Sequence, residues 1–284
     1  MKVVVFGAGG QVGAELVSQA RAVGHEVVGL TRVSHDITDG AATRERIHQE
    51  RPEVVFNAAA YTAVDRAESE PEVAAAINAT APAVMAAACA RAGIRLVHYS
   101  TDYVFDGTAT APIPEDAPVA PLGVYGATKL AGEEAVRAAD ARAYVVRTAW
   151  VYGLDGTNFI RTVLRLTRER GEMRVVDDQR GSPTWARDLA AASLRLVEDC
   201  PPGTYHLTNS GDCTWYELAL AVVRHAGIQA RITPIATGEY LTAARRPAYS
   251  VLDNRAWREA GQPALRAWQE AIAEFVPTLA AAPP

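Results

Sequence analysis

Tyr125 and Lys129 are the first residues of this chain whose types and spacing point to chemistry. They stand four residues apart in the segment 125–139, whose pattern predicts a helix, so they share one face of it. A lysine ammonium beside a phenol stabilises the phenolate and lowers the pKa of the tyrosine. Tyr125 would then donate a proton to a carbonyl oxygen and accept one in the reverse direction. This spacing is common by chance, so other residues must support it.

Thr101, which precedes Asp102, adds that support. The run 95–100 predicts a buried strand, and residues that follow the strands of an open parallel sheet lie at its ligand crevice. From there the Thr101 hydroxyl can hydrogen-bond the same carbonyl oxygen as Tyr125. Taken alone, Thr101 is better explained as a hydroxyl that caps a turn. The combination with Tyr125 and Lys129 is what favours carbonyl chemistry.

A glycine-rich loop lies between a predicted strand (3–6) and a predicted helix (12–20), with the sequence Gly7-Ala8-Gly9-Gly10-Gln11-Val12-Gly13. Glycines permit a tight turn and let backbone N–H groups approach a pyrophosphate. The N-terminus of the helix directs partial positive charge at the phosphates. The spacing alone also fits a structural turn, but its position favours dinucleotide binding. The predicted cofactor contacts are Gly7, Gly9, Gly10, Gln11 and Val12.

The end of the second predicted strand (25–30) indicates which dinucleotide is bound. Thr31-Arg32 stands there in place of the acidic residue that holds a free ribose 2′-hydroxyl, and an arginine can bind a 2′-phosphate. This favours NADPH over NADH, with NADH use left open. The alternative is that Arg32 is an ordinary solvated charge. Asp36 and Ile37 follow, and we expect them near the adenine.

The elements that must position these residues alternate between strand and helix. Strands are predicted at 3–6, 25–30, 53–57, 95–100 and 143–148, and helices at 12–20, 45–51, 73–92 and 125–139. This alternation predicts an α/β fold: a Rossmann-type doubly wound parallel sheet with a small mixed C-terminal substrate lobe. Residues 1–152 would form the dinucleotide-binding domain, rejoined by 184–207, and residues 153–183 and 208–284 the lobe.

Composition narrows the classes of function. Of 284 residues, 49% are apolar and 21% charged, as in ordinary globular proteins. The net charge of −5 argues against nucleic acid as a partner, because a phosphate-binding surface normally needs a basic excess. The apolar stretch 73–92 is alanine-rich and interrupted, so we expect a buried helix and no membrane contact. Three scattered cysteines, no metal-binding histidine spacing and no signal-peptide pattern predict a reduced, cytoplasmic protein.

Taken together and in order, several motifs resemble the dTDP-4-dehydrorhamnose reductase family, a branch of the extended short-chain dehydrogenases/reductases. Besides the glycine loop and Tyr125 to Lys129, they are Asn57-Ala58-Ala59-Ala60-Tyr61-Thr62-Ala63-Val64-Asp65, Ser100-Thr101-Asp102-Tyr103-Val104-Phe105-Asp106-Gly107, Arg147-Thr148-Ala149-Trp150-Val151-Tyr152-Gly153 and Arg246-Pro247-Ala248-Tyr249-Ser250-Val251-Leu252-Asp253. The resemblance covers nearly the whole chain. It is more specific for the family than for the substrate.

The resemblance implies NADPH-dependent reduction of the C4 ketone of a dTDP-4-dehydro-6-deoxyhexose, first of all dTDP-4-dehydro-L-rhamnose to dTDP-L-rhamnose. Tyr125 would be the general acid, Lys129 would lower its pKa and hold the nicotinamide ribose, and Thr101 would orient the ketone. The nicotinamide end of the cofactor would be lined by Ala58, Ala59, Ala60 and Thr62. The dTDP-sugar would be contacted by Val64, Thr101, Asp102, Tyr103, Trp150, Asn158 and Arg246.

One departure from the family concerns oligomers. Some members form dimers through acidic residues that share a magnesium ion, one in the first helix and one after a Gly-x-Pro-Thr segment. Glu15 occupies the first position, but Arg187 stands at the second, in Gly181-Ser182-Pro183-Thr184-Trp185-Ala186-Arg187. A cation cannot ligate magnesium. We therefore expect no bound metal and no metal-bridged dimer, but a monomer or a weak homodimer.

Alternative functions stay open at this point. The same motifs fit a 4-ketoreductase for another dTDP-deoxysugar or branched sugar in natural-product biosynthesis. They also fit a non-catalytic NADP-binding regulatory subunit, although the intact Thr101, Tyr125 and Lys129 favour catalysis. Sugar-nucleotide 4,6-dehydratases are disfavoured, because Tyr103 follows Asp102 where those enzymes carry a second acid. Three further tryptophans lie on helical patterns and are interpreted as packing residues: Trp215, Trp257 and Trp268.

Overall fold

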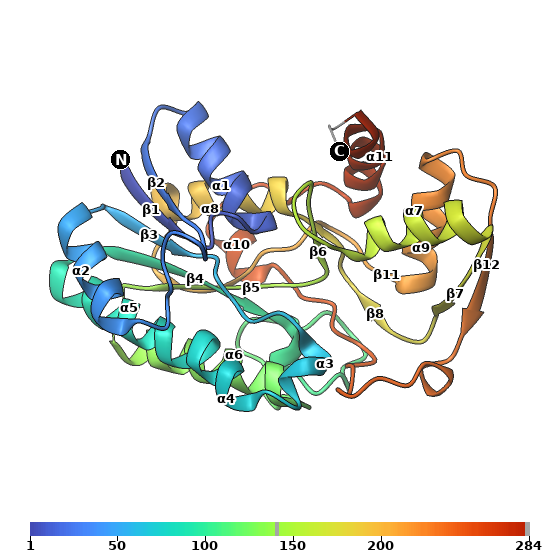
Figure 1. The fold of residues 1–284 in the computed structure, drawn as a ribbon, viewed down its shortest axis with the longest axis horizontal. Helices are drawn as coiled ribbons and strands as arrows, with labels where there is room; N and C mark the ends of the chain where they lie inside the picture. Colours follow the sequence, from blue (N-terminus) through green and yellow to red (C-terminus); the bar gives the residue numbers. More distant parts are fainter. Residues whose placement is uncertain (140–141, 282–284) are drawn as a thin grey trace.

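The computed structural model describes residues 1–139 and 142–281, so residues 282–284 of the predicted lobe lie outside it. A six-stranded parallel sheet forms the centre of the molecule (Figure 1). Its spatial order is β10-β5-β4-β3-β1-β2, with β1 (Lys2–Phe6), β2 (Glu26–Leu30), β3 (Val54–Asn57), β4 (Arg95–Thr101), β5 (Tyr144–Thr148) and β10 (Gly203–His206). β2 is added on one side of β1, and β3 and the later strands are added on the other side. This change of side opens a crevice between the carboxyl ends of β1 and β3.

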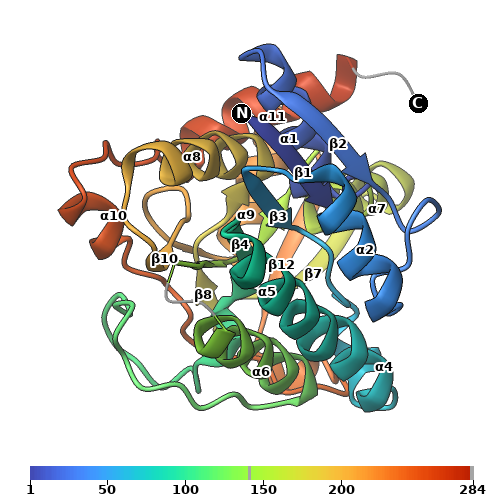
Figure 2. The same ribbon diagram turned by 90° about the vertical axis from the view of Figure 1, so that its left-hand side faces the viewer.

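Helices cover both faces of this sheet (Figure 2). α1 (Gln11–Ala22) and α8 (Ala186–Asp199) pack on one face, and α2 (Gly40–Glu50), α5 (Ala81–Ala92) and α6 (Val124–Ala139) on the other. Along β1, Val3 and Val5 belong to the core cluster under α1 and α8, while Val4 and Phe6 belong to the cluster under α2 and α5. A strand that is buried on both faces has a continuous apolar sequence, as this one does. The predicted doubly wound α/β class is therefore confirmed.

The alanine-rich helix is continuous but irregular. α4 (Pro71–Ala75) passes through a π-helical turn (76–80) into α5. Pro82 explains the position of this turn, because it lacks an N–H and the carbonyl of Asn78 cannot receive the usual helical bond from it. That carbonyl lies close to α6, where a Cβ on Gly132 would approach it to 2.1 Å. Such π turns are frequent at functional sites, and this one brings Asn78 into the core beside α6.

Within the described ranges, the stretch Pro71–Ala92 is the one helix long and apolar enough to cross a membrane. Its 18-residue window is 44% buried inside the protein, and α5 packs between α2 and α6. These contacts are those of a core helix.

A second group of elements faces the carboxyl ends of the strands, on the right of Figure 1. It comprises α7 (Phe159–Arg170), α9 (Trp215–His225) and α11 (Trp268–Ala281), with the parallel pair β7 (Glu172–Val176) and β12 (Arg231–Ile235). Two short pairs accompany them: β6 (Val151–Tyr152) with β9 (Thr184–Trp185), and β8 (Arg180–Gly181) with β11 (Cys213–Thr214). A separate apolar core, which includes Ile160, Trp185 and Phe275, holds this group together. Short helices lie at α3 (Val64–Ala67), α10 (Arg255–Glu259) and the 3-10 turns 102–104 and 237–239.

Candidate active site

Thr101 ends β4 and Tyr125 lies in the first turn of α6, and their side chains meet at the carboxyl edge of the sheet. The Thr101 hydroxyl donates to Asp102 Oδ1 at 2.9 Å and accepts the Tyr103 N–H at 3.2 Å, so its position is fixed. Burial raises the pKa of Tyr125 to about 12, and the hydrogen bond with Thr101 offsets part of that rise. Tyr125 is thus a protonated phenol at neutral pH. Such a group beside a fixed hydroxyl suits proton donation to a carbonyl oxygen.

Lys129 lies one turn further along α6 and is 2% exposed. Its Nζ donates to the Tyr99 carbonyl at 2.5 Å and lies 3.4 Å from His98 Nε2. Burial lowers the pKa of Lys129 to about 8, against the opposing charge of Glu133. The structure differs here from the expectation that Lys129 lowers the pKa of Tyr125. The amine is engaged by β4, and the pKa of Tyr125 is set by burial, Thr101 and Asp102.

Asp102 is 2% exposed, and its carboxylate accepts from Thr101. Burial raises its pKa to about 6, while hydrogen bonds with Ser250 and Thr101 lower it. The structure therefore gives Asp102 a part in orienting Thr101. Tyr103, next to it, is half-buried, and its ring meets the Tyr125 ring edge-on at 5.5 Å.

The glycine loop joins β1 to α1 at the crevice between β1 and β3. Gly7 has φ +79°, which favours glycine, and a Cβ there would lie 2.6 Å from the Ala59 nitrogen. A Cβ on Gly13 would lie 2.1 Å from the Gly7 carbonyl oxygen, so α1 can pack against the loop only through glycine. Gly10 precedes α1 without a side-chain cap, which leaves the first N–H groups of this helix free for an anion. Gly9 faces Thr31, and Val12 packs below the loop between two core clusters.

Two asparagines that the sequence analysis did not single out shape the loop after β3. This loop carries the predicted nicotinamide contacts Ala58, Ala59, Ala60 and Thr62. Asn57 Oδ1 accepts the Ala59 N–H at 3.3 Å. Asn78, from the π turn, accepts the Tyr61 N–H at 2.9 Å and donates to the Tyr61 carbonyl at 3.1 Å. Both asparagines are fully buried, so the loop is held from below.

The loop after β2 carries the predicted adenosine contacts. Arg32 is solvent-exposed and lies close enough to Asp36 for its charge to lower the pKa of that carboxyl, after the larger effect of two hydrogen bonds from Thr38. Asp36 thus shapes the turn itself. Ile37 is half-buried against the core beneath α2 and α5. Among these residues Arg32 has the side chain that is free to meet a ligand.

Trp150 lies behind a second cavity, stacked against Trp215, which lines it. Its φ of +48° is unusual for a non-glycine residue, and its indole stacks on Trp215 with ring centroids 3.5 Å apart. Gly181 permits this, because a Cβ there would lie 2.5 Å from the Trp150 ring. Trp215 packs against Trp150, Phe159 and the core of this group, as expected, and it also lines a cavity of about 210 Å³. Its other walls include Phe159, Met173, Gln179, Tyr240 and Arg246.

Two contacts join this cavity region to the dinucleotide crevice. Arg246 pairs with Asp65 of α3 at 2.7 Å, next to the predicted substrate contact Val64. Asn158 caps α7 by accepting the Arg161 N–H at 3.1 Å, and its amide donates to Gln11 Oε1 at 3.0 Å. A predicted substrate residue and a predicted cofactor residue therefore touch directly.

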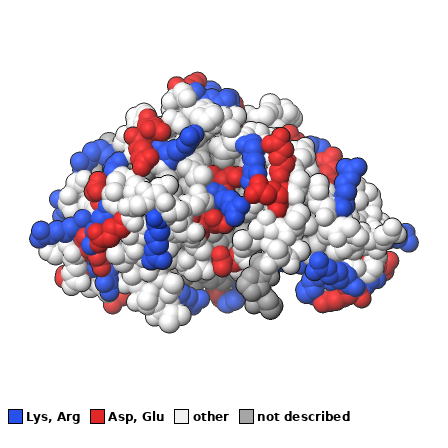
Figure 3. Space-filling model, turned by 90° about the horizontal axis from the view of Figure 1, so that it is seen from above, with Lys and Arg blue, Asp and Glu red and all other residues white. Residues whose placement is uncertain are grey.

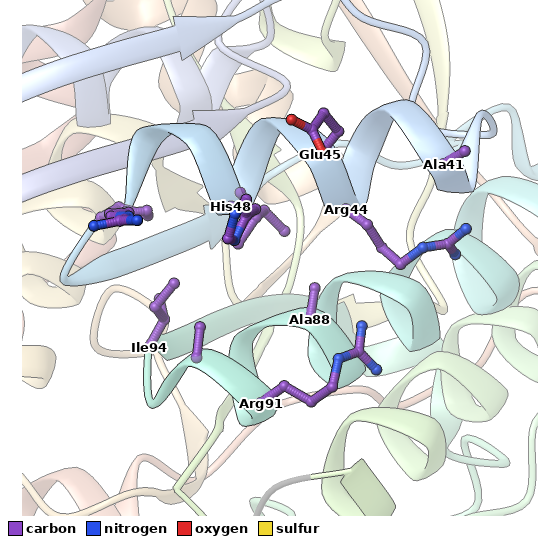
Figure 4. A pocket seen from close by; sticks show the side chains of 11 residues that line it. Ala41, Arg44, Glu45, His48, Ala88, Arg91 and Ile94 are labelled. Atoms are coloured by element: carbon purple, nitrogen blue, oxygen red, sulfur yellow. The ribbon is translucent and has the colours of Figure 1, made fainter.

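A larger cavity, of about 780 Å³, lies elsewhere, between α2 and α5 (Figure 4). Arg44, His48 and Arg91 line it together with apolar residues such as Ala88 and Ile94, and none of the predicted site residues takes part. On the face drawn in Figure 3, acidic and basic side chains are interspersed. In residues 1–139 and 142–281 no group of three or more His, Cys, Asp or Glu side chains is arranged to hold a metal ion.

Gln19 links Glu15 to the backbone of Arg187. Gln19 donates to Glu15 Oε2 at 3.1 Å and to the Arg187 carbonyl at 2.9 Å. The Arg187 guanidinium pairs with Glu274 of α11 at 3.0 Å and lies over the Trp185 ring. The guanidinium of Arg187 is thus directed to Glu274 and Trp185.

A parallel sheet with a glycine loop at its crevice, and a Thr101, Tyr125 and Lys129 set beside it, define a protein of the extended short-chain dehydrogenase/reductase class. The family model described as "RmlD substrate binding domain" matches residues 1–281. The chain belongs to the dTDP-4-dehydrorhamnose reductase family, as the sequence motifs predicted.

Members of this family match the chain in sequence or structure over most of their length. The chain is 44% identical to a dTDP-4-dehydrorhamnose reductase of Streptomyces griseus (97% of this chain, 93% of that protein). It is 41% identical to a dTDP-4-keto-6-deoxy-D-glucose reductase of Streptomyces niveus (97% and 96%). A dTDP-4-dehydrorhamnose reductase of Bacillus anthracis, solved in complex with NADP, superposes with a TM-score of 0.95 at 36% identity (98% and 99%).

Proposed function

We propose that this protein is an NADPH-dependent reductase of the C4 ketone of a dTDP-4-dehydro-6-deoxyhexose, with dTDP-4-dehydro-L-rhamnose as substrate and dTDP-L-rhamnose as product. The observation that carries the proposal is the meeting of Thr101 and the protonated Tyr125 at the mouth of the dinucleotide crevice. The names of the 44% identical relative and of the NADP-bound neighbour support the same reaction.

The cofactor fits the residues present. Glycine at positions 7 and 13 leaves a backbone cradle that a Cβ would fill, and the uncapped start of α1 supplies N–H groups for the pyrophosphate. Arg32 supplies a cation for the 2′-phosphate, with no acidic side chain at 31 or 32 to favour NADH. Bound there, the nicotinamide supplies the hydride that is added to C4.

The chain's own residues supply the proton and the orientation. Tyr125 donates its phenolic proton to the ketone oxygen as that oxygen becomes a hydroxyl. Thr101 donates its one hydroxyl proton to Asp102 Oδ1 in this structure. When the ketone is bound, the hydroxyl would turn to donate to the ketone oxygen and fix it against Tyr125. Lys129, one turn along α6 from Tyr125 and held by the Tyr99 carbonyl, would return a proton to the phenolate that results.

The nucleotide part of the substrate belongs in the lobe formed by 153–183 and 208–284, opposite the dinucleotide-binding domain (1–152 and 184–207). We place the base in the cavity beside Trp215, with Arg246 reaching the diphosphate and Trp150 packing on the sugar. Val64, Tyr103 and Asn158 would border the sugar between the two parts.

The test incubates the protein with NADPH and a panel of dTDP-4-keto-6-deoxyhexoses, follows the loss of NADPH absorbance and identifies each product by NMR. Turnover of dTDP-4-dehydro-L-rhamnose above all others supports the proposal. Preference for another keto sugar selects the alternative that the 41% identical Streptomyces niveus reductase represents. Reduction of none of them, with intact NADPH binding, favours a regulatory subunit. The three cysteines are all buried, which suits the reducing cytoplasm where we place the reaction. We propose a monomer or a weak homodimer.

A further inference from the structure

His98 is a buried imidazole that the reaction as described does not use. It lies in the middle of β4, three residues before Thr101, and is 0% exposed. Its Nδ1 is 3.1 Å from the Asn57 amide nitrogen, and its Nε2 is 3.4 Å from Lys129 Nζ. The ring therefore connects the end of β3 to the lysine of the active site through the interior of the protein.

Hydrogen bonds determine which ring nitrogen carries the proton. Asn57 Oδ1 accepts the Ala59 N–H, which leaves the Asn57 amide N–H to donate to His98 Nδ1. Nδ1 is then an acceptor, so the proton of the neutral ring is on Nε2. Burial, together with the charge of Lys129, holds the pKa of His98 well below its usual value, and the ring stays neutral. The Nε2–H consequently faces Lys129.

The two protonation states of Lys129 meet this N–H differently. An ammonium has three donors and no acceptor, whereas the neutral amine has a lone pair. Only the neutral amine can accept from His98; the ammonium places two donors against each other. The Tyr99 carbonyl accepts from Lys129 in either state. His98 therefore stabilises the neutral amine.

Few other charges act on Lys129. Glu133, one turn along α6, raises the pKa of Lys129, but the Arg147 guanidinium of β5 binds that carboxylate at 2.8 Å. Tyr125, one turn earlier on α6, is a protonated phenol. The neighbours from β3 and the π turn, Asn57 and Asn78, are neutral amides. Burial lowers the pKa of Lys129. The opposing effects of His98, which favours the neutral amine, and Glu133, which favours the ammonium, then set its final value.

We propose that His98 is a positioning residue that, through its Nε2–H, holds the Lys129 amine and makes it ready to give up its proton. The catalytic part of this inference rests on the proposed function. After Tyr125 has protonated the ketone oxygen, a proton passes from the Lys129 ammonium to the Tyr125 phenolate and re-forms its O–H bond. The neutral Lys129 left behind accepts from His98 until solvent protonates it again.

The lysine content of the chain permits a direct test. Lys2 and Lys129 are the only two lysines of the sequence, so lysine labelled with ¹³C at the ε carbon gives two NMR signals. Lys2→Arg removes the signal of Lys2, whose pKa is raised by Glu50 and Glu26. In that background the pH titration of Lys129 is followed without substrate, which separates this inference from the proposed function.

Two substitutions of His98 form a matched pair. His98→Asn keeps an acceptor near Nδ1 for Asn57 but removes the donor to Lys129, and we expect the Lys129 midpoint to rise by about 0.5–1 pH unit. His98→Gln places an amide near Nε2, and its midpoint should stay near that of the parent. The alkaline limb of kcat/KM should move with the NMR midpoint. Asn57→Ala, which frees the ring to change tautomer, should also raise the midpoint and serves if His98→Asn does not fold.

An unchanged Lys129 midpoint in folded His98→Asn or Asn57→Ala overturns the proposal. Equal shifts in His98→Asn and His98→Gln also overturn it, because they would report altered packing and not the loss of one donor. Absence of ketone reduction in the wild type, with the NMR shifts as expected, would refute the proposed function and leave the assignment of His98 to Lys129 intact.

Discussion

Removal of the Glu133 carboxylate should destabilise the fold sharply. Glu133 is fully buried on α6 and binds the Arg147 guanidinium through both oxygens, with Nε to Oε1 at 2.9 Å and Nη2 to Oε2 at 2.8 Å. Arg147 is itself 4% exposed. In Glu133→Ala the guanidinium keeps the Glu115 carbonyl and the face of Phe105 as neighbours but no anion. An uncompensated buried charge costs about 3–5 kcal/mol, which corresponds to a fall in Tm of roughly 6–15 °C for a chain of this size.

Urea unfolding followed by circular dichroism measures this loss. Arg137 is the matched control, because it pairs with the same carboxylate at 2.9 Å but is 41% exposed. Arg137→Ala should cost less than about 1 kcal/mol. Glu133→Leu combined with Arg147→Met removes both charges and should recover most of the loss. A cost below about 1 kcal/mol for Glu133→Ala, or a double variant as unstable as the sum of its singles, would refute the reasoning.

Three further predictions concern stability, cofactor choice and assembly. Burial raises the pKa of Asp102 from 3.8 to about 6, so the folded state binds this proton more tightly than the unfolded state and the wild type loses stability as pH rises from about 4 to 6. Asp102→Asn lacks this loss, and its stability relative to wild type should improve by about 2–3 kcal/mol between pH 4 and pH 7 in urea titrations; parallel curves would contradict this. Arg32→Ala should lower kcat/KM for NADPH roughly ten- to a hundredfold and leave kcat/KM for NADH almost unchanged. Equal losses with both cofactors would refute a contact between Arg32 and the 2′-phosphate. Since Arg187 stands at the position where the second acidic magnesium ligand would be, sedimentation velocity should give the same oligomeric state in magnesium and in EDTA, and a dimer that depends on magnesium would count against this.

The sequence allowed the prediction of the elements whose local pattern is strongest. Continuous apolar strands, the glycine loop and the Tyr125-to-Lys129 spacing predicted the sheet, its crevice and the face of α6. In the region 159–176 no element was predicted, although Ile160, Val163 and Leu164 of α7 recur at helical spacing and are buried. β7 pairs with β12 alone, and its exposed residues break the apolar run by which a buried strand is recognised.

Contacts between distant segments were beyond the reach of sequence pattern. Nothing local indicates that Asn57 and Asn78 hold one loop from below, or that His98 faces Lys129, because each contact joins strands and helices far apart in the chain. Trp215 sits on a helical pattern that also fits a core residue. Its place at the cavity depends on the left-handed backbone of Trp150 and on Gly181, which only the folded chain brings together.

The central claim is that Tyr125 donates the proton to the ketone, and the measurement that tests it most directly compares wild type and Tyr125→Phe in single-turnover reduction of dTDP-4-dehydro-L-rhamnose by NADPH. Phenylalanine keeps the ring against Tyr103 and removes only the hydroxyl. NADPH affinity, measured by fluorescence titration, should be nearly unchanged, while the rate of reduction should fall by a factor of at least about 10²–10⁴, as expected for loss of a general acid. Wild-type-like turnover by Tyr125→Phe would contradict the account.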